Sequence, residues 1–154
     1  MRIALFQPDI PQNTAAIIRL CACLGVPVDI IHPCGFLFSD PGFRRAGMDY
    51  VELADVWQHA SWEAFLAASR GRLVLMTTKA EQAYTDFSFR ESDIVLLGRE
   101  SAGVPDAVHA AADARLRIPL RPGLRSLNVA MTAAMALGEA LRQTRQLQAE
   151  VGNS

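Results

Sequence analysis

The sequence predicts an open α/β fold in which a mostly parallel sheet carries helices on both faces. Two continuous apolar runs, Leu73–Thr77 and Ile94–Leu97, have the composition of strands buried on both sides, as in a parallel sheet. Segments of strand character alternate with segments of helical periodicity along the chain. No repeat, linker or low-complexity tract divides the sequence, so we expect a single domain over residues 1–154.

The first strand and helix follow from the N-terminal residues. Arg2–Phe6 has strand character, and the turn after it is rich in Pro and Asn and contains Asn13 and Thr14, either of which can cap a helix. Apolar residues at helical spacing extend that helix to Leu24, and Gly25 is a typical stop. Further strands are expected at Val28–Ile31, Tyr50–Leu53 and Leu116–Pro119, and further helices at Ser61–Ser69, Pro105–Ala112 and Ser126–Leu147.

Residues 32–47 are expected to be rich in loops. The aromatic side chains of this passage are expected to pack in the core: Phe36, Phe38 and Phe43. Cys21 and Cys23 are also expected to be core thiols, because an odd total of three cysteines argues against a disulfide framework. The three histidines are isolated in the sequence, so we expect no metal site.

Composition and charge limit the class of protein. A content of 51% hydrophobic and 20% charged residues is typical of a globular protein. No apolar run reaches the length of a membrane span, and the apolar segment after Met1 is too short for a secretory signal. A soluble cytoplasmic protein is therefore expected. The net charge of −1 argues against a nucleic-acid binder of strongly basic character.

The cationic residues are unevenly distributed. All but one of the 15 cationic side chains are arginine, and the window 115–125 contains Arg115, Arg117, Arg121 and Arg125 without an acidic residue. The planar guanidinium group suits phosphate, so this window is a candidate anion-binding edge. A solvated loop at the rim of the fold is the alternative.

A glycine-containing loop follows the strand that ends at Leu97. In open α/β sheets ligands bind beyond the carboxyl ends of the strands, so the loops after Leu75, Leu97 and Ile118 are expected to form the site. The glycine motifs of dinucleotide-binding folds and P-loops are absent from the sequence. Gly98 and Gly103 would let a ligand lie against main-chain N–H and C=O groups. A tight turn from strand to helix is the alternative explanation.

Two further motifs contain polar residues in apolar surroundings. Leu124–Asn128 precedes the last helix, where Ser126 or Asn128 is either a helix cap or a contact for a polar ligand. Arg19 lies in an otherwise apolar helix, where an arginine either reaches the surface or is held near an anion.

Taken in this order, three stretches resemble the three motifs of the SPOUT methyltransferases. They are NTAAIIR from Asn13, LLGRESAGVP from Leu96 and IPLRPGLRSLN from Ile118. Within that superfamily the short chain is most similar to the small tRNA ribose 2′-O-methyltransferases that act at the wobble nucleotide. The similarity includes QPDIPQNT, IIHPCGF and RRAGMDY, so it spans nearly the whole chain.

The resemblance implies an α/β fold with a C-terminal trefoil knot, an obligate homodimer and S-adenosyl-L-methionine bound in the knot. The activity it implies is methylation of the ribose 2′-oxygen of cytidine or uridine 34, in the anticodon loop of tRNA. Carried over by position, the residues that contact the cofactor are Met76, Thr77, Gly98, Glu100, Gly103, Ile118, Leu120, Ser126 and Leu127.

The resemblance also implies a set of polar residues around the transferred methyl group: Arg19, Asn13, Glu100 and Asn128. Guanidinium hardly ever loses its proton in proteins, so we interpret Arg19 as a positioner of a phosphate or oxyanion and not as a base. The other three residues are expected to orient the reacting groups.

The sequence departs from the family pattern in two places. Ala15 and Ala16 stand where relatives often have glycine and asparagine, and Ala130 and Met131 stand where relatives often have serine and asparagine.

The cationic residues expected to bind RNA are Arg44, Arg45, Lys79, Arg121 and Arg125. The alternatives are a SPOUT enzyme acting on ribosomal RNA or on a base, and a non-catalytic α/β module that binds RNA or a nucleotide.

Overall fold

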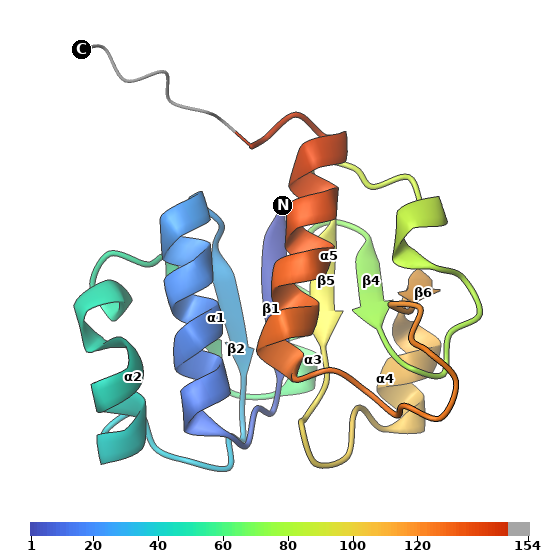
Figure 1. Ribbon diagram of the computed structural model, residues 1–154. Coiled ribbons are helices and arrows are strands. Elements are labelled where there is room, and N and C mark those ends of the chain that lie inside the picture. The colour runs from blue at the N-terminus through green and yellow to red at the C-terminus, as the bar shows by residue number, and fades with distance from the viewer. Residues whose placement is uncertain (148–154) are drawn as a thin grey trace.

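The computed structural model describes residues 1–147, except for the side chains of residues 47–49. The strands in this range are β1 (Arg2–Phe6), β2 (Val28–Ile31), β3 (Val56–His59), β4 (Leu73–Met76), β5 (Ile94–Leu97) and β6 (Ala114–Leu116). They form one sheet in the order β3-β2-β1-β5-β4-β6, and every neighbouring pair is parallel (Figure 1). The expected parallel α/β sheet is confirmed.

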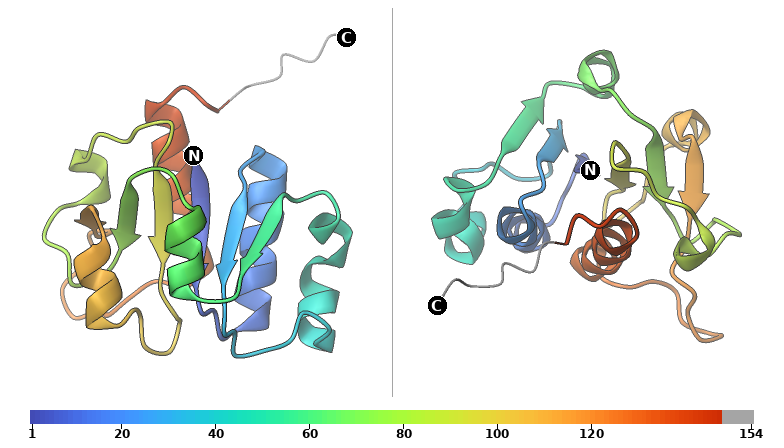
Figure 2. Two further views of the ribbon diagram at one scale, coloured as in Figure 1. Left: turned by 180° about the vertical axis from the view of Figure 1, so that it is seen from behind. Right: turned by 90° about the horizontal axis from the view of Figure 1, so that it is seen from above.

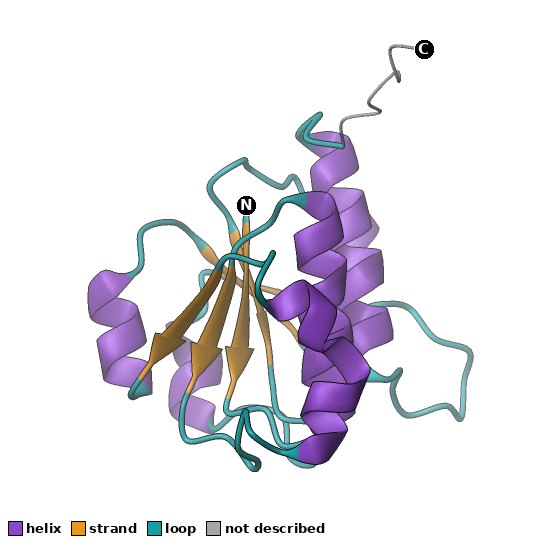
Figure 3. Ribbon diagram, turned by 90° about the vertical axis from the view of Figure 1, so that its left-hand side faces the viewer, coloured by secondary structure: helices purple, strands orange, loops and turns teal. Residues whose placement is uncertain are grey.

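Helices cover both faces of this sheet. They are α1 (Pro11–Leu24), α2 (Pro41–Val51), α3 (Trp62–Ala68), α4 (Asp106–Ala111) and α5 (Val129–Gln143), with a 3-10 turn at Tyr84–Asp86. The pair α1 and α5 lies on one face with α2 packed against α1, and α3 and α4 lie on the other face (Figure 2). Figure 3 shows the strands between the two helix layers.

The core consists of two apolar layers, one on each side of the sheet. Ile3 and Leu5 of β1 face the layer under α1 and α5, whereas Ala4 and Phe6 face the layer under α3 and α4, where Phe65 is fully buried. Successive side chains of a strand point to opposite faces. Both faces are covered, which explains why β4 and β5 are apolar at every position. Burial of each large side chain contributes about 1.5–3 kcal/mol.

The prediction of a strand at Tyr50–Leu53 is wrong, because Tyr50 and Val51 form the end of α2 and a turn follows at residues 52–53. Asp40 caps this helix: its carboxylate accepts hydrogen bonds from the main-chain N–H of Gly42 (2.7 Å) and Phe43 (3.3 Å). Pro41 at the first helical position has a fixed φ that suits a helix start. The cap and the proline thus begin a helix in a passage that was expected to be loop-rich.

The predicted packing of the aromatic cluster Phe36, Phe38 and Phe43 is confirmed. Their ring centroids lie 4.8–6.0 Å apart, and Phe43 is buried. The expectation for the thiols is only half right, since Cys21 is buried but Cys23 is exposed. Two residues along a helix rotate the side chain by about 200°, so both cannot face the same core.

Several predicted boundaries differ from the structure. Helix α1 begins at Pro11 after an N-cap, Ile10, whose side chain makes no capping hydrogen bond, so Asn13 and Thr14 lie inside the helix. The last helix starts at Val129, not at Ser126, and ends at Gln143. Strand β6 ends at Leu116, because the main chain of Arg117 pairs instead with residues 82–84. Strand β3 was missed because its residues VWQH are partly polar and lie at the sheet edge.

Candidate active site

A cavity of about 650 Å³ lies at the carboxyl ends of the central strands. Three loops and the start of α1 form its walls: the loop after β5, the residues after β4, and the segment that leads into α5. A smaller cavity of about 80 Å³ adjoins it and shares Thr77, Ser126 and Leu127 as lining residues. This is the edge of the sheet where open α/β folds bind ligands.

The two cavities bring together all the residues that were predicted to contact the cofactor. The larger one is lined by Thr77, Gly98, Glu100, Gly103, Ser126 and Leu127. The smaller one is lined by Met76, Ile118 and Leu120 in addition to the shared residues. Loops that are distant in sequence therefore meet at one rim of the sheet, as the sequence led us to expect.

The glycines of the loop after β5 are needed for the conformation of the loop. Arg99 and Gly103 exchange two main-chain hydrogen bonds of 2.9 and 2.8 Å, which close the loop. A Cβ on Gly98 would lie 2.7 Å from the carbonyl carbon of Gly103, whereas a Cβ on Gly103 would meet open space. Gly103 has a φ of +65°, a conformation that favours glycine. Gly98 is thus required by the close approach of the protein's own main chain, and the explanation by ligand contact alone was incomplete.

Glu100 is held by a residue that the sequence did not single out, Asp9 in the loop between β1 and α1. The main-chain N–H of Asp9 donates to Glu100 Oε2 (3.1 Å), and the main-chain N–H of Glu100 donates to Asp9 Oδ1 (3.2 Å). The hydroxyl of Ser101 also donates to the Asp9 carboxylate. Burial, and then the hydrogen bond with the Asp9 side chain, raise the pKa of Glu100 above its ordinary value. The same side-chain contact lowers the pKa of Asp9.

Asn128 joins the first and the last helix at the cavity. Its Oδ1 accepts a hydrogen bond from the main-chain N–H of Ala130 (2.8 Å), which makes it the N-cap of α5. Its Nδ2 donates to Asn13 Oδ1 (3.0 Å) on α1. Both asparagines line the larger cavity, so Asn128 is a cap and is also available to a ligand.

Arg19 lies elsewhere in the described chain. Its guanidinium carbon stands 4.6 Å from the ring centroid of Tyr50 on α2, and the side chain is exposed. In the part of the chain that the structure describes, Arg19 is not among the residues that line either cavity. Within one chain, Asn13, Glu100 and Asn128 therefore lie together at the larger cavity, whereas Arg19 lies outside it.

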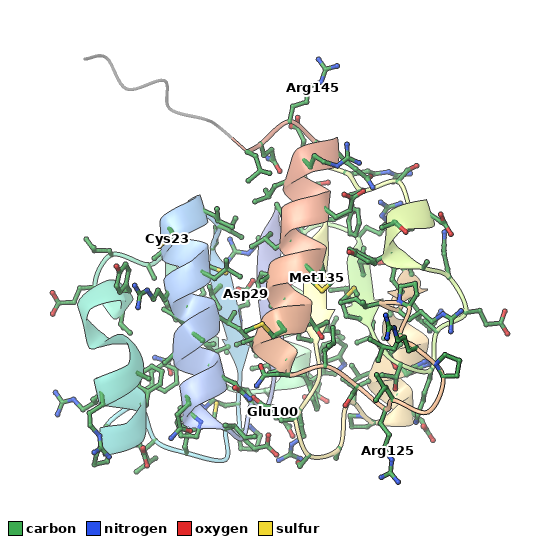
Figure 4. The ribbon with its side chains drawn as sticks, in the orientation of Figure 1. Cys23, Asp29, Glu100, Arg125, Met135 and Arg145 are labelled. Atoms are coloured by element: carbon green, nitrogen blue, oxygen red, sulfur yellow. The ribbon has the colours of Figure 1, made fainter. Side chains whose placement is uncertain are left out.

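The side chains predicted to bind RNA are exposed near the same end of the sheet. Lys79 lines the larger cavity, and Arg121 and Arg125 lie on the loop before α5. In Figure 4, Arg125 and Glu100 lie at the same end of the molecule. Arg44 and Arg45 lie in the first turns of α2, which follows the carboxyl end of β2.

Arg115, from the same arginine-rich window, has a structural role. Its guanidinium donates to the carbonyl oxygens of His109 (2.8 Å), Ala110 (3.2 Å) and Ala112 (3.1 Å) at the end of α4. These carbonyl groups lack partners inside the helix, and a cation near a helix C-terminus is favourable. The anion-binding interpretation of the window does not therefore extend to this residue.

The departures from the family pattern lie outside the site. Ala15 and Ala130 are buried in the core, and Ala16 and Met131 are exposed on the helices. Among the described residues that line the two cavities, none of these positions occurs.

Across residues 1–147, no cluster of three or more metal-ligating side chains is present. In the same range, the helices are too short or too polar to cross a membrane.

The chain belongs to the SpoU rRNA Methylase family, which matches residues 1–138. A relative from Beijerinckia indica subsp. indica, named tRNA (cytidine(34)-2'-O)-methyltransferase, is 62% identical over 148 residues, or 94% of this chain and 92% of the relative. A solved structure described as giving insights into the 2-OH methylation of C/U34 on tRNA has a TM-score of 0.88 and 40% identity, over 92% of this chain and 94% of that chain. The predicted resemblance to the SPOUT methyltransferases is confirmed.

A more distant neighbour carries a cofactor. The AdoMet-bound rRNA methyltransferase from Sinorhizobium meliloti has a TM-score of 0.83 and 25% identity, over 92% of this chain and 55% of that chain. The common fold thus occurs in an enzyme that binds S-adenosylmethionine.

Proposed function

We propose that this chain transfers a methyl group from S-adenosylmethionine to the ribose 2′-oxygen of nucleotide 34, the wobble position of tRNA. The observation that carries this proposal is the 62% identity, over 94% of the chain, with a relative named for that reaction. The convergence of the three motif loops on one cavity supports it.

The two cavities suit the methyl donor chemically. Met76, Ile118 and Leu120 give the smaller cavity apolar walls that fit a flat heterocycle. The larger cavity contains the carboxyl group of Glu100 and the hydroxyl of Ser126, which are polar partners for a cationic, polar ligand. When bound, S-adenosylmethionine would supply an electrophilic methyl group at this site.

Side chains of the protein bind and align the target ribose of the tRNA. Asn13, Glu100 and Asn128 line the cavity and orient the ribose hydroxyl, and alignment of this kind can supply a large part of a rate enhancement. Arg19 positions an RNA phosphate or the developing oxyanion. It lies beside α2, the helix that also carries Arg44 and Arg45.

The active form is a homodimer of single-domain chains that pair through the outer face of α1 and α5. This face exposes apolar side chains that a monomer would leave in water: Met131 is 58% and Met135 42% exposed on α5, and Ala16 is exposed on the adjacent helix α1. Figure 4 shows Met135 on the outer surface of α5. Small and flexible apolar residues on two adjacent helices allow close packing of a second copy.

A trefoil knot at residues 117–128 is part of the proposal. Strand β6 lies at one edge of the sheet, whereas α5 packs against α1 and β5 near its middle, so the segment between them crosses the carboxyl end. The start of this segment pairs with the loop after β4, since the main-chain N–H of Arg117 donates to the carbonyl of Gln82 (2.9 Å). The crossing is where the knot of the family would form.

The RNA is bound by the cationic side chains at this end of the sheet, namely Arg44, Arg45, Lys79, Arg121 and Arg125. Contacts between arginine and phosphate release counterions, so the affinity for tRNA should fall steeply as the salt concentration rises. Because the substrate is tRNA, the protein acts in the cytoplasm.

The test is to incubate the purified protein with S-adenosylmethionine and unmodified tRNA, and to locate the methyl group by nuclease digestion and mass spectrometry. A 2′-O-methyl group at nucleotide 34 is the expected product. Methylation of ribosomal RNA alone, or of a base, would favour another SPOUT reaction. Binding of RNA without any methyl transfer would favour the non-catalytic module.

A further inference from the structure

Asp9 connects two segments that are 91 residues apart in the sequence. Its carboxylate accepts hydrogen bonds from the main-chain N–H of Glu100 and from the hydroxyl of Ser101, and its own N–H donates to the Glu100 carboxyl. The two residues therefore hold each other through both main chain and side chain. These contacts fix the direction of the Glu100 carboxyl, and not only the position of the loop.

The loop that carries Asp9 packs against the main chain that follows β2. The main-chain N–H of Gly35 donates to the carbonyl of Pro8 (2.9 Å). A Cβ on Gly35 would lie 2.7 Å from Cβ and 2.9 Å from Cα of Asp9, so the main chain after β2 packs directly against this residue. Asp9 is thus held between two loops, and a small displacement of its side chain would be transmitted to Glu100.

Glu100 and Ser101 line the larger cavity, and in the described structure Asp9 is not among the lining residues. We propose that Asp9 is a positioning residue for methyl transfer: it holds the Glu100 carboxyl in the orientation in which it accepts a hydrogen bond from the target ribose hydroxyl. This inference rests on the proposed function, because the ribose hydroxyl enters through it.

The charges around Glu100 determine how this arrangement responds to pH. Four other titratable side chains line the same cavity: Lys79, Arg99, Asp106 and His109. The nearby carboxylate of Asp9 adds to burial in raising the pKa of Glu100. The ionised form of Glu100 accepts the hydrogen bond, so activity should be lost as the pH falls through the pKa of Glu100.

The decisive variant is Asp9→Asn, which keeps the size of the side chain and removes its charge. The amide can donate to the Glu100 carboxylate and stabilise its ionised form, so the acidic limb of the pH profile of kcat/KM should move to lower pH. An amide NH2 in place of Oδ2 cannot accept the hydrogen bond from Ser101, and the resulting misalignment of Glu100 should lower kcat by about tenfold or more, with little change in KM for tRNA. Asp9→Glu should have a kcat between those of Asp9→Asn and the wild type. Glu100→Gln should abolish the acidic limb of the pH profile of kcat/KM.

Asp55→Asn is the matched control, since the Asp55 carboxylate accepts a hydrogen bond from Trp57 (2.7 Å) directly before the edge strand β3 and does not line the cavity in the described structure. This variant should keep the wild-type rate and pH profile. If Asp9→Asn shows the wild-type pH profile, Asp9 does not act through Glu100 and the inference fails. A drop in kcat without any shift of the limb would likewise reduce Asp9 to a purely structural role.

The failure of the proposed function would be visible separately, as wild-type protein that transfers no methyl group to tRNA. In that case the pH dependence of S-adenosylmethionine binding, measured by calorimetry, replaces the kinetic profile. Asp9→Asn should shift the pH midpoint of binding downwards, because Glu100 lines the cavity in either case. An unshifted midpoint would overturn the link between Asp9 and Glu100.

Discussion

Substitution of Gly98 by alanine tests whether the loop after β5 needs a residue without a side chain. The added Cβ would lie 2.7 Å from the carbonyl carbon, 2.9 Å from Cα and 3.0 Å from the carbonyl oxygen of Gly103. Carbon atoms in contact prefer a separation of about 3.5–4.0 Å, so the main chain at Gly103 must move by about 1 Å. No flexible side chain can absorb this movement, because all three atoms belong to the main chain.

The expected cost has two parts. Overpacking of this kind destabilises a protein by about 1–3 kcal/mol. The displacement also strains the two hydrogen bonds between Arg99 and Gly103, each of which contributes about 0.5–1.5 kcal/mol. Because this loop lines the cavity, we expect Gly98→Ala to weaken S-adenosylmethionine binding by about tenfold to a hundredfold, or about 1.4–2.7 kcal/mol.

Isothermal calorimetry measures the binding, and urea denaturation measures the free energy of unfolding. Gly103→Ala is the control, because a Cβ there meets open space and the substitution adds only the cost of its φ of +65°, about 1–2 kcal/mol. Gly98→Ala should therefore reduce donor binding more than Gly103→Ala does. Wild-type affinity in Gly98→Ala would refute the steric argument.

Three further substitutions have definite expected outcomes. Arg19→Ala should keep donor affinity in calorimetry yet lose methyl transfer, and a normal turnover rate would remove Arg19 from the mechanism. Asn128→Ala should cost about 1 kcal/mol through loss of the cap, and more through loss of the bond to Asn13, which corresponds to a fall in Tm of at least about 2–4 °C in a melting experiment. An unchanged Tm would contradict this role. Met135→Glu should yield monomers in sedimentation velocity, because a charge on the outer face of α5 would be buried in the dimer, and an unaltered oligomeric state would contradict the proposed interface.

The sequence was most informative where a single local rule decides the structure. The continuous apolar runs that became β4 and β5 are typical of strands covered on both faces, and Ser61 correctly predicted the start of α3. The helix α2 was missed because its stretch begins with Pro41 and Gly42 and also contains Gly47, residue types that are typical of loops. Its start depends on the Asp40 cap, a signal that was present in the sequence but was not used.

For the site, the family motifs predicted which loops meet, but not the contacts between them. The bond between Asp9 and Glu100 joins positions 91 residues apart, and no spacing rule relates them. The proline- and asparagine-rich turn after β1 was the available signal for Asp9, since its carboxylate lies directly beyond a central strand. The separation of Arg19 from the cavity follows from spacing that was not considered, because Arg19 lies six residues after the cavity residue Asn13 on α1, about 9 Å along the helix and on a different side of it.

The bond between Asn13 and Asn128 has a consequence for synthesis on the ribosome. Strand β1 is made before the other described elements, yet its partners in the sheet include β5, and α1 packs against α5, which follows all six strands in the sequence. The binding cavity therefore cannot be complete until its last lining residues, Asn128, Val129 and Thr132, have left the exit tunnel. A nascent chain of this protein should acquire affinity for its methyl donor only after α5 has left the exit tunnel, and a chain released before residue 128 should have none.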